Sequence, residues 1–398
     1  MAATHQEHKP KLTARIASQR LWGERPFFLL DVGASGGVER RWFVFRELLR
    51  AIGFDPLVAE VERLNQANTH PGVRYEAALV GVDGYDELFP PALRGDRLTS
   101  KNNCAFERSS AAAAQRQLSA RTGQTYIQTV FNAGAAVVWT DRLVTLDSFV
   151  PSAEQPFVDF IKIDTDGHDV EVLLGAERLL RSGGALGVSV ELQHHGAVHE
   201  YANTFSNIDR LLRRHGFTMF DLQLFRYSRA TLPGQFAVRL GAHTVSGPVL
   251  SSEGLYFRDL ADSGYEQMWS YDISRERVLK LVCLFEIFGL RDCAAELLVN
   301  RVADSHVDEL LDLLVDGNPG SYHARLKEFE RDFTSFYPPD VADERPATEE
   351  PKTRALNSRI EELKAKNGAL TQRLQQQDTQ IKSLKRLIKD VKRRPKQA

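Results

Sequence analysis

The sequence predicts an α/β protein built on a doubly wound, mostly parallel sheet. Three observations carry this expectation. Strand-like and helix-like segments alternate from about residue 27 to 240. Several of the strand-like runs are apolar without interruption, which is typical of parallel strands because both of their faces are covered. Acidic or glycine-rich turns follow these runs directly, where the ends of parallel strands carry ligand-binding residues.

The expected strands and helices follow from local patterns. Helical spacing marks residues 41–51, 168–184 and 204–217, and the last two segments finish on glycine as helix C-termini do. Residues 82–140 have weak periodicity and are expected to form a long excursion over the sheet. The expected strands cover residues 27–32, 51–55, 73–80, 157–164 and 185–191, followed by antiparallel strands at 219–228 and 234–242.

The rest of the chain is expected to form separate units. A helical module follows the sheet, because three amphipathic segments lie between Ser274 and Gly317. A stretch rich in Pro and acidic residues has almost nothing to bury and reads as a linker. The expected units are an N-terminal extension (1–25), the sheet domain (26–245), the helical module (246–338), the acidic linker (339–352) and a coiled coil (353–395).

The C-terminal coiled coil is predicted from apolar residues spaced by three and four between Ile360 and Val391. Asn367 falls on this seam, where asparagine commonly fixes the register of a parallel dimer. We therefore expect self-association through residues 353–395. The basic residues that crowd the end of this segment are expected to be a solvated face, with peripheral contact to an anionic membrane surface as the alternative.

Charge and cysteine content narrow the function classes. Eight Lys or Arg and one Asp give residues 379–398 a formal charge of +7. Because the net charge of the chain is −2, the other 378 residues have a formal charge of −9. An acidic body argues against a nucleic-acid groove, where affinity depends on neutralising phosphates. Three scattered cysteines without a CxxC pair argue against zinc and fit a reducing cytoplasm. With no signal-like N-terminus and no long apolar run, we expect a soluble cytoplasmic protein.

The stretch "FLLDVGASGG" (28–37) predicts a ligand-binding turn after the first strand. A dinucleotide site would show a GxG opening, which is absent, and Asp31 would repel a pyrophosphate. The same carboxylate would attract the cationic amino and sulfonium groups of S-adenosylmethionine. We therefore expect this cofactor to bind Asp31, Gly33, Ala34, Gly36 and Asp55, the last through the ribose hydroxyls. A plain structural turn at the glycines and a turn-forming Asp55 before Pro56 are the alternatives.

The segment "VDFIKIDTDGHDVEVLLGAERLL" (158–180) resembles the hallmark of the FkbM-type methyltransferases, I-K-I-D-x-E-G-x-E followed by a helix with L-x-G-A. Asp166 and Asp169 stand where the family usually has Glu, which shortens the reach of each carboxylate. The similarity extends to "TLDSF" (145–149) and covers about residues 28–240. It implies a Rossmann-like class I fold and S-adenosylmethionine-dependent O-methylation, often of sugars, glycans or secondary metabolites.

Acids and histidines are expected to gather at one edge of the sheet, because each follows an apolar strand. A hydroxyl acceptor needs a general base, and His168 and His194 are the candidates, with Asp164 orienting the base or the acceptor. Asp166 and Glu191 are expected to contact the substrate. A divalent metal on Asp164, Asp166 and Glu191 is a less favoured alternative, and either histidine could be a plain helix-start or loop residue. Lys162 is expected to be a structural ion partner.

Together these residues predict an S-adenosylmethionine-dependent O-methyltransferase that acts on a saccharide hydroxyl, in the cytoplasm or at the inner membrane face. A scaffold that keeps the fold without turnover, and recruits partners through the helical module and coiled coil, is the second hypothesis. A nicotinamide-dependent enzyme is the third, against which the missing GxG argues. The sequence does not identify the acceptor or its hydroxyl position.

Overall fold

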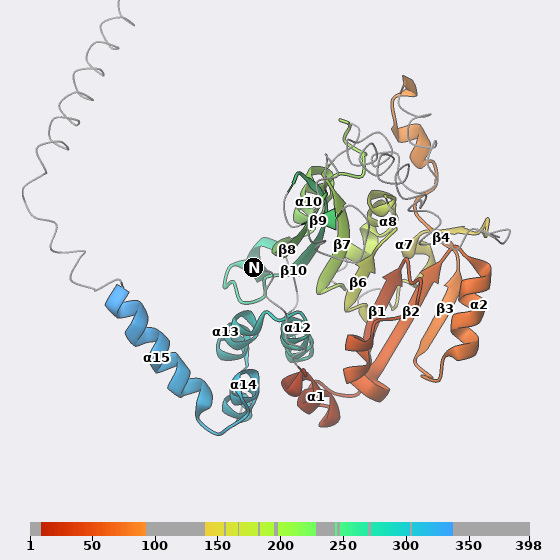
Figure 1. Ribbon diagram of the computed structural model, residues 1–398. Coiled ribbons are helices and arrows are strands. Elements are labelled where there is room, and N and C mark those ends of the chain that lie inside the picture. The colour runs from red at the N-terminus through yellow and green to blue at the C-terminus, as the bar shows by residue number, and fades with distance from the viewer. Residues whose placement is uncertain are drawn as a thin grey trace, which may run out of the picture. The chain divides into compact units, whose positions relative to one another are not determined.

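The computed structural model describes residues 9–92, 140–154, 157–165, 167–181, 184–194, 198–227, 243–244, 247–269, 271, 273–302 and 305–336. Within these residues the main sheet has the strand order β3-β2-β1-β6-β7-β10-β8-β9. The first five strands are parallel, and the chain runs outward from β1 in one direction and from β6 in the other (Figure 1). The structure therefore confirms the Rossmann-like, doubly wound fold.

The parallel strands form where uninterrupted apolar runs predicted them. Every residue of β1 is buried, as a central strand covered on both faces requires. The run expected at residues 73–80 divides in two, because the chain leaves the sheet edge at Ala78 and pairs β4 (Leu79–Val80) with β5 (Leu143–Val144) in a separate small sheet. The parallel strands of the main sheet are β1 (Phe27–Val32), β2 (Leu49–Asp55), β3 (Val73–Ala77), β6 (Phe160–Ile163) and β7 (Gly187–Gln193).

The helix expected at residues 41–51 is a 3₁₀ segment, η1 (Arg40–Leu48), followed directly by β2. Its buried side chains, Trp42, Phe45 and Leu48, are three residues apart. Arg46, inside this segment, has a φ of +52° and breaks the helical backbone, so the expected continuous helix does not form.

The helix expected at residues 168–184 is broken into α8 (Asp169–Leu174) and α9 (Glu177–Arg181). At the break, a Cβ on Gly175 would lie 2.1 Å from the carbonyl oxygen of Gly81, so only glycine fits there. The Asp147 carboxylate accepts hydrogen bonds from the backbone N–H groups of Arg178 and Leu179, both at 2.8 Å, and so caps α9. The "TLDSF" and "LGA" segments thus hold each other in place.

The sheet continues beyond the predicted boundary at residue 245. Strand β10 (Val249–Arg258) lies between β7 and β8 (Phe217–Tyr227) and is antiparallel to both, with β9 (His243–Thr244) outside β8. Sequence analysis missed β10, because "VLSSEGLYFR" mixes polar residues and a glycine with its apolar ones. Gly254 allows close contact there, since a Cβ would lie 2.4 Å from Leu192. The strand predicted at 234–242 lies outside the described residues.

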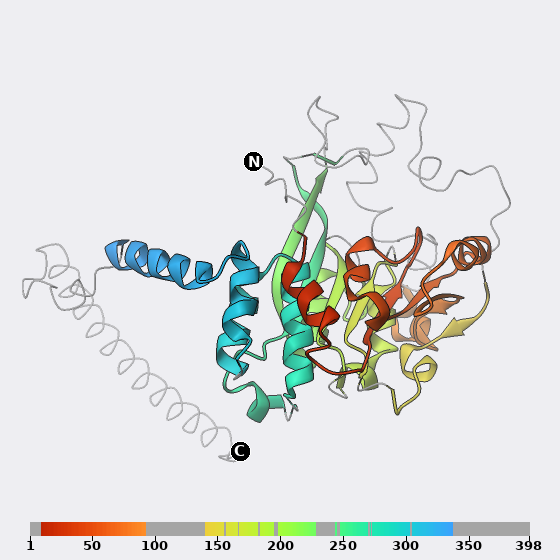
Figure 2. The same ribbon diagram turned by 90° about the horizontal axis from the view of Figure 1, so that it is seen from below.

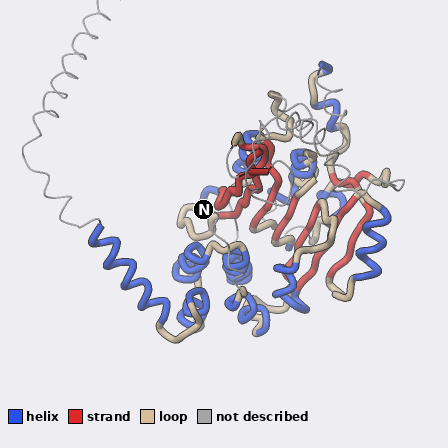
Figure 3. Tube along the Cα trace, viewed as in Figure 1, coloured by secondary structure: helices blue, strands red, loops and turns tan. Residues whose placement is uncertain are grey.

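Two hydrophobic cores cover the two faces of the sheet. Successive residues of β1 alternate between them, Phe27 and Leu29 on one face and Phe28 and Leu30 on the other. Figures 1 to 3 show the helices flanking the strands. The Phe28 face packs against α7 (Leu146–Phe149), α8, α9 and α10 (Phe205–Arg214), and the Phe27 face against α1 (Lys11–Ser18), η1 and α12 (Arg275–Ile287), with α13 (Arg291–Arg301) and α14 (Val307–Val315) beyond. The remaining short helices are α2 (Val58–Ala67), η2 (Tyr85–Leu88) and α11 (Tyr265–Trp269).

The three helices predicted after the sheet are confirmed as α12, α13 and α14. Two buried charges on α12 attach them to the rest of the fold. Glu286 accepts hydrogen bonds from the N–H groups of Leu12 (3.0 Å) and Thr13 (2.6 Å), which caps α1 within the expected N-terminal extension. Lys280 forms an ion pair with Asp159 at the start of β6, with 2.9 Å between Nζ and Oδ2.

Helix α15 (Ser321–Phe336) is the last element described. The predicted linker (339–352), coiled coil (353–395) and basic C-terminus lie outside the described residues and stay predictions. Among the residues that the structure describes, no helix is long and apolar enough to cross a membrane.

Candidate active site

Several of the predicted site residues lie at the carboxyl ends of the parallel strands. Strands β1, β2, β6 and β7 are parallel, and the chain changes direction between β1 and β6, the place where doubly wound sheets bind ligands. In the register, Asp31 lies between Gly53 on β2 and Lys162 on β6. Asp55 ends β2, and Asp164 follows β6. Asp166 lies outside the described residues.

Two glycines of the turn after β1, Gly33 and Gly36, differ in how much space surrounds them. Gly33 has a φ of +83°, and a Cβ there would lie 1.8 Å from the carbonyl oxygen of Asp164. The N–H groups of Gly33 and Ala34 both donate to the Phe54 carbonyl at 2.9 Å, which ties the turn to β2. Gly36 also has a positive φ, +82°, but no atom lies within 4 Å of the Cβ position. Gly33 is therefore required by packing, whereas Gly36 borders open space.

Asp31 is buried and Lys162 is largely buried, and Lys162 connects Asp31 to the exposed carboxylate of Asp164. The Lys162 Nζ lies 3.5 Å from Asp31 Oδ1 and 3.3 Å from Asp164 Oδ2. Asp31 Oδ1 makes no hydrogen bond. Burial raises the pKa of Asp31 to about 6, even though Lys162 opposes the shift. Burial disfavours the charged Lys162, but Asp31 and Asp164 outweigh it and raise the pKa of this ammonium. The predicted role of Lys162 as an ion partner agrees with these contacts.

Asp55 lies at the same edge and forms a turn. Its Oδ1 accepts a hydrogen bond from the Leu57 N–H at 2.8 Å, so the turn alternative raised by the sequence is present in the structure. Burial raises the pKa of Asp55, while this hydrogen bond opposes the rise. The predicted contact with a ribose stays a prediction.

His168 precedes α8 and has an acidic partner that sequence analysis missed. The His168 Nδ1 lies 2.6 Å from Glu171 Oε1, three residues along the chain, and the side chain is 35% exposed. A carboxylate at Nδ1 favours the tautomer with its proton on that nitrogen and leaves Nε2 as the basic atom. The spacing His-x-x-Glu at a helix start could have identified the pair.

Asp169 and Asn203 hold the loop between β6 and α8. Asp169 is fully buried; its Oδ1 accepts from the Thr165 N–H at 3.3 Å and its Oδ2 from the Asn203 side-chain amide at 2.9 Å. Burial raises the pKa of Asp169 to about 6, and Asn203 opposes this. Asn203 also accepts from the Val170 N–H. Because Asn203 lies in a loop before α10 without a recognisable motif, no sequence signal pointed to it.

The other predicted histidine, His194, lies just after β7. Its Nε2 is 2.8 Å from the Ser252 hydroxyl on β10, and its ring stacks on Phe205 with 5.5 Å between centroids. These contacts fix the ring and fit the loop alternative better than they fit a base. Glu191, expected to be the last residue of its strand, lies within β7, which continues to Gln193, and it is directly opposite Glu253 on β10.

Gln193 is a polar residue at this edge that sequence analysis did not single out. It is the last residue of β7, and the alternation of strand side chains places it on the same face as Glu191. Its side chain is 4% exposed, yet neither amide atom has a hydrogen-bond partner. A buried amide without partners is costly, so this position is a candidate for contact with a ligand.

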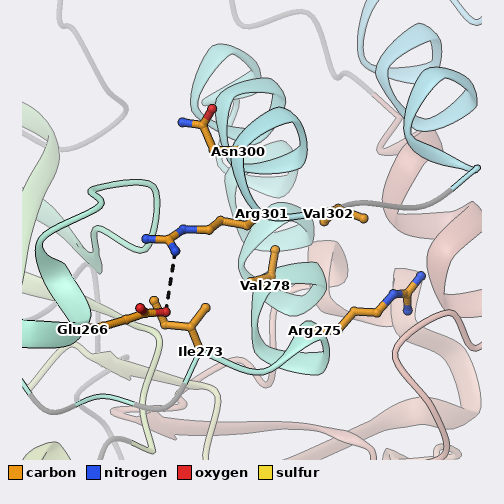
Figure 4. A pocket seen from close by; sticks show the side chains of 7 residues that line it. All are labelled: Glu266, Ile273, Arg275, Val278, Asn300, Arg301 and Val302. Atoms are coloured by element: carbon orange, nitrogen blue, oxygen red, sulfur yellow. Dashed lines mark ion pairs between the residues drawn. The ribbon is translucent and has the colours of Figure 1, made fainter.

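A cavity of about 340 Å³ lies elsewhere, between α11, α12 and α13 (Figure 4). Arg301 on its wall is already held by the carbonyls of Leu260 and Asp262 and by an ion pair with Glu266 at 3.5 Å. These contacts connect α13 to the segment that contains α11, so Arg301 has a structural role at this cavity. Across the described part of the chain, no group of three or more His, Cys, Asp or Glu side chains is arranged to hold a metal ion.

Comparison with known proteins finds a family model that matches most of the sheet domain. Residues 31–219 match the family model described as the methyltransferase FkbM domain. No curated protein matches the chain. The FkbM match includes the glycine turn, Asp55, the "IKID" segment and the end of β7.

Three of the solved structures that resemble the chain are methyltransferases, each at low sequence identity. A TehB-like SAM-dependent methyltransferase from Corynebacterium glutamicum is 11% identical, with 63% of this chain and 90% of that chain covered and a TM-score of 0.24. The magnesium protoporphyrin IX methyltransferase of Synechocystis, solved with bound SAM, is 9% identical over 62% and 76%, with a TM-score of 0.26. A Burkholderia thailandensis 1,6-didemethyltoxoflavin-N1-methyltransferase with bound S-adenosylhomocysteine is 15% identical over 64% and 79%, with a TM-score of 0.24. At these scores, strand order and the family match remain the basis of the fold assignment.

Proposed function

We propose that the methyltransferase FkbM domain formed by residues 31–219 transfers the methyl group of S-adenosylmethionine to a hydroxyl oxygen of a saccharide. The observation that carries the proposal is the charge at the switch point between β1 and β6. Two carboxylates, Asp31 and Asp164, share a single ammonium, that of Lys162. Glu39 adds a further negative charge near Asp31. The surplus negative charge favours a cationic ligand there.

The residues at this edge fit such a cofactor. Asp31 Oδ1 is buried without a hydrogen-bond donor. An amino group of the cofactor would donate a hydrogen bond to this oxygen, and the sulfonium would offset the negative charge of the carboxylate. Gly36 borders open space, so its backbone can approach a ligand closely. Asp55, at the end of the neighbouring strand, has its second carboxylate oxygen for a ribose hydroxyl while Oδ1 holds the turn. The cofactor would supply an electrophilic methyl carbon bonded to a positively charged sulfur.

His168 is the residue that this geometry favours as general base. With Glu171 on Nδ1, Nε2 can take the proton of an acceptor hydroxyl as the oxygen–carbon bond forms and the carbon–sulfur bond breaks. The acceptor must be aligned with the donor, and Asp164, next to the glycine turn, is placed to orient its hydroxyl. Hydroxyl chemistry and a saccharide acceptor are suggested by the family resemblance, and the acid-rich edge supports them, since carboxylates bind hydroxyls well.

Calorimetric titration with S-adenosylmethionine tests the cofactor. We expect binding to the intact chain, a loss of more than about tenfold in affinity for Asp31→Asn and Asp55→Asn, and no change for Glu296→Gln on the surface of α13. Asparagine at position 55 keeps an acceptor for the Leu57 N–H, so the turn is preserved. No heat with the intact chain would overturn the proposal in favour of the scaffold hypothesis.

The catalytic assignment needs a separate measurement. His168→Ala should bind the cofactor normally and lower methyl transfer by about 10²-fold or more. His194→Ala is the matched control, since its ring is held by Ser252 and Phe205, and it should retain turnover. Mass spectrometry of cell-envelope glycans with and without the protein identifies the acceptor through one missing methyl group. Normal turnover in His168→Ala contradicts the base assignment.

A further inference from the structure

Helix α15 presents a row of large apolar side chains to solvent. The exposed fractions are 37% for Leu326, 64% for Phe329, 54% for Phe333 and 75% for Phe336. These four residues, called here the α15 stripe, are separated by three, four and three positions. That is the spacing of a coiled-coil seam, with Leu326 and Phe333 at a positions and Phe329 and Phe336 at d positions.

The apolar face of this helix is largely exposed. No residue of α15 is buried, although the helix has 16 residues. Most helical stability in proteins comes from packing one apolar face of the helix and not from the helix alone. Contact between Phe329 and Phe333, whose ring centroids are 6.0 Å apart, covers only part of the stripe. Burial of the remaining aromatic surface would stabilise α15.

The charges beside the stripe indicate which partner fits. With Leu326 at position a, Arg325 occupies position g and Glu330 occupies position e. In a parallel pair of helices, position g of one copy faces position e of the following heptad in the other. Arg325 and Glu330 are five residues apart, so two copies in register bring opposite charges together on both sides of the seam. An antiparallel pair does not produce this match.

We propose that α15 pairs in parallel with α15 of a second copy of this chain, through the α15 stripe. Two further charged residues agree with this arrangement. Glu328 and Arg331 fall at positions c and f, away from the seam, and form an ion pair within their own helix at 3.8 Å. A parallel arrangement is also the one that Asn367 favours in the coiled coil expected at residues 353–395. This interface is distinct from that predicted coil and does not depend on the proposed function.

Disulfide cross-linking in the full-length chain tests the interface even if the predicted coil also dimerises. Leu326→Cys, in a chain with Cys104 and Cys293 replaced by serine, puts the thiols of two copies together at position a. Arg331→Cys at position f is the matched control, because it points away from a partner. We expect at least about tenfold more cross-linked dimer for Leu326→Cys under mild oxidation. Equal yields, or none from either variant, would overturn the proposal.

A charge exchange tests the parallel register. Arg325→Glu alone and Glu330→Arg alone should each slow the cross-linking of Leu326→Cys by up to about fivefold, as exposed ion pairs allow. The double variant should restore the original rate, because the pair is re-formed with reversed signs. Failure of the double variant to recover would overturn the parallel register. Cross-linking that occurs only when anionic lipid vesicles are present would instead assign the stripe to a membrane surface and overturn the proposal.

Discussion

Two buried Asp–Lys pairs lie at opposite ends of the central parallel strands. They differ in how many of their polar atoms have hydrogen-bond partners. At the amino end of β6, Lys280 Nζ lies 2.9 Å from Asp159 Oδ2, from the Pro26 carbonyl and from Glu276. Asp159 also accepts from the Phe28 N–H at 2.8 Å. At the carboxyl end of β1, Lys162 lies 3.5 Å from Asp31, whose Oδ1 makes no hydrogen bond.

The difference separates a structural contact from a binding site. A buried charge is tolerated when its hydrogen bonds are complete, and the Asp159–Lys280 pair reaches that state with groups of this chain alone. It attaches α12 to the sheet. The Asp31–Lys162 pair leaves an oxygen without a donor beside an open glycine turn. A buried oxygen without a hydrogen-bond donor lowers the stability of the fold. Such an oxygen is expected at a site where a ligand supplies the missing donor.

Lys280→Met should produce the largest effect on stability. Removal of the ammonium leaves Asp159 buried without its counter-ion, at a cost of about 3–5 kcal/mol of the free energy of unfolding. Lys162→Met is the matched variant at the other edge and should cost less, about 1–2 kcal/mol, because Asp31 with its pKa near 6 can accept a proton instead. Urea unfolding at neutral pH measures both losses. Equal losses would remove the contrast between the two pairs.

Gly33→Ala should give the next largest effect. The backbone at φ +83° strains any other residue, and the added Cβ would meet the Asp164 carbonyl at 1.8 Å, so we expect a loss of about 2–4 kcal/mol. Gly36→Ala is the control with the same φ and open space, and should cost about 1 kcal/mol. Thermal unfolding of the two variants compares them directly. A Gly36→Ala variant as unstable as Gly33→Ala would show that backbone strain alone matters.

The sequence predicts the sheet where local patterns are strong. Continuous apolar runs placed β1, β2, β6 and β7, and α10 ends where Gly216 takes a positive φ of +83°. The acids at the carboxyl edge followed from the same strands. Sequence analysis missed β10 because this strand mixes polar and apolar residues. Such a strand is stabilised by its two antiparallel neighbours, β7 and β8, and their positions are known only once the sheet is assembled.

The partners of the site residues were less predictable, because they come from distant segments. Asn203 donates to Asp169 across 34 positions of the chain, and the Tyr75 hydroxyl oxygen accepts a hydrogen bond from the Val38 N–H at 3.0 Å. Such contacts depend on how loops pack, which periodicity does not report. Lys162 is the exception, since its place between Asp31 and Asp164 follows from strand register.

The pH dependence of stability sharpens the contrast through Asp31. Its pKa is raised from 3.8 to about 6 by burial, so the folded state holds more protons than the unfolded state between these values. Stability should therefore fall as pH rises from about 4 to 6, by no more than about 3 kcal/mol. Asp31→Asn should flatten this fall. Asp169 titrates near pH 6 as well, so the measurement is the difference between the parent and variant urea curves from pH 4 to 8.

Affinity for a cationic ligand, measured by calorimetric titration over the same pH range, should change in the opposite direction. Ionised Asp31 attracts S-adenosylmethionine, so binding should strengthen as pH rises through about 6 and level off above it. Asp31→Asn should bind weakly with little dependence on pH in this range. Parallel pH profiles for the parent and the variant would mean that Asp31 does not face the ligand.

Gln193→Leu should have the smallest effect on stability, and it tests whether incomplete hydrogen bonding at the carboxyl edge marks a binding role. The amide is buried and has no partner, so an apolar side chain of similar volume should leave the free energy of unfolding within about 1 kcal/mol of the parent or raise it. If Gln193 binds the acceptor, methyl transfer to the glycan should nevertheless fall by about tenfold or more. Gln223→Leu, at an exposed amide on β8, is the control and should leave transfer unchanged. A destabilised Gln193→Leu variant with normal transfer would show that the amide has a structural role. A ligand contact predicts the reverse, a loss of methyl transfer without a loss of stability.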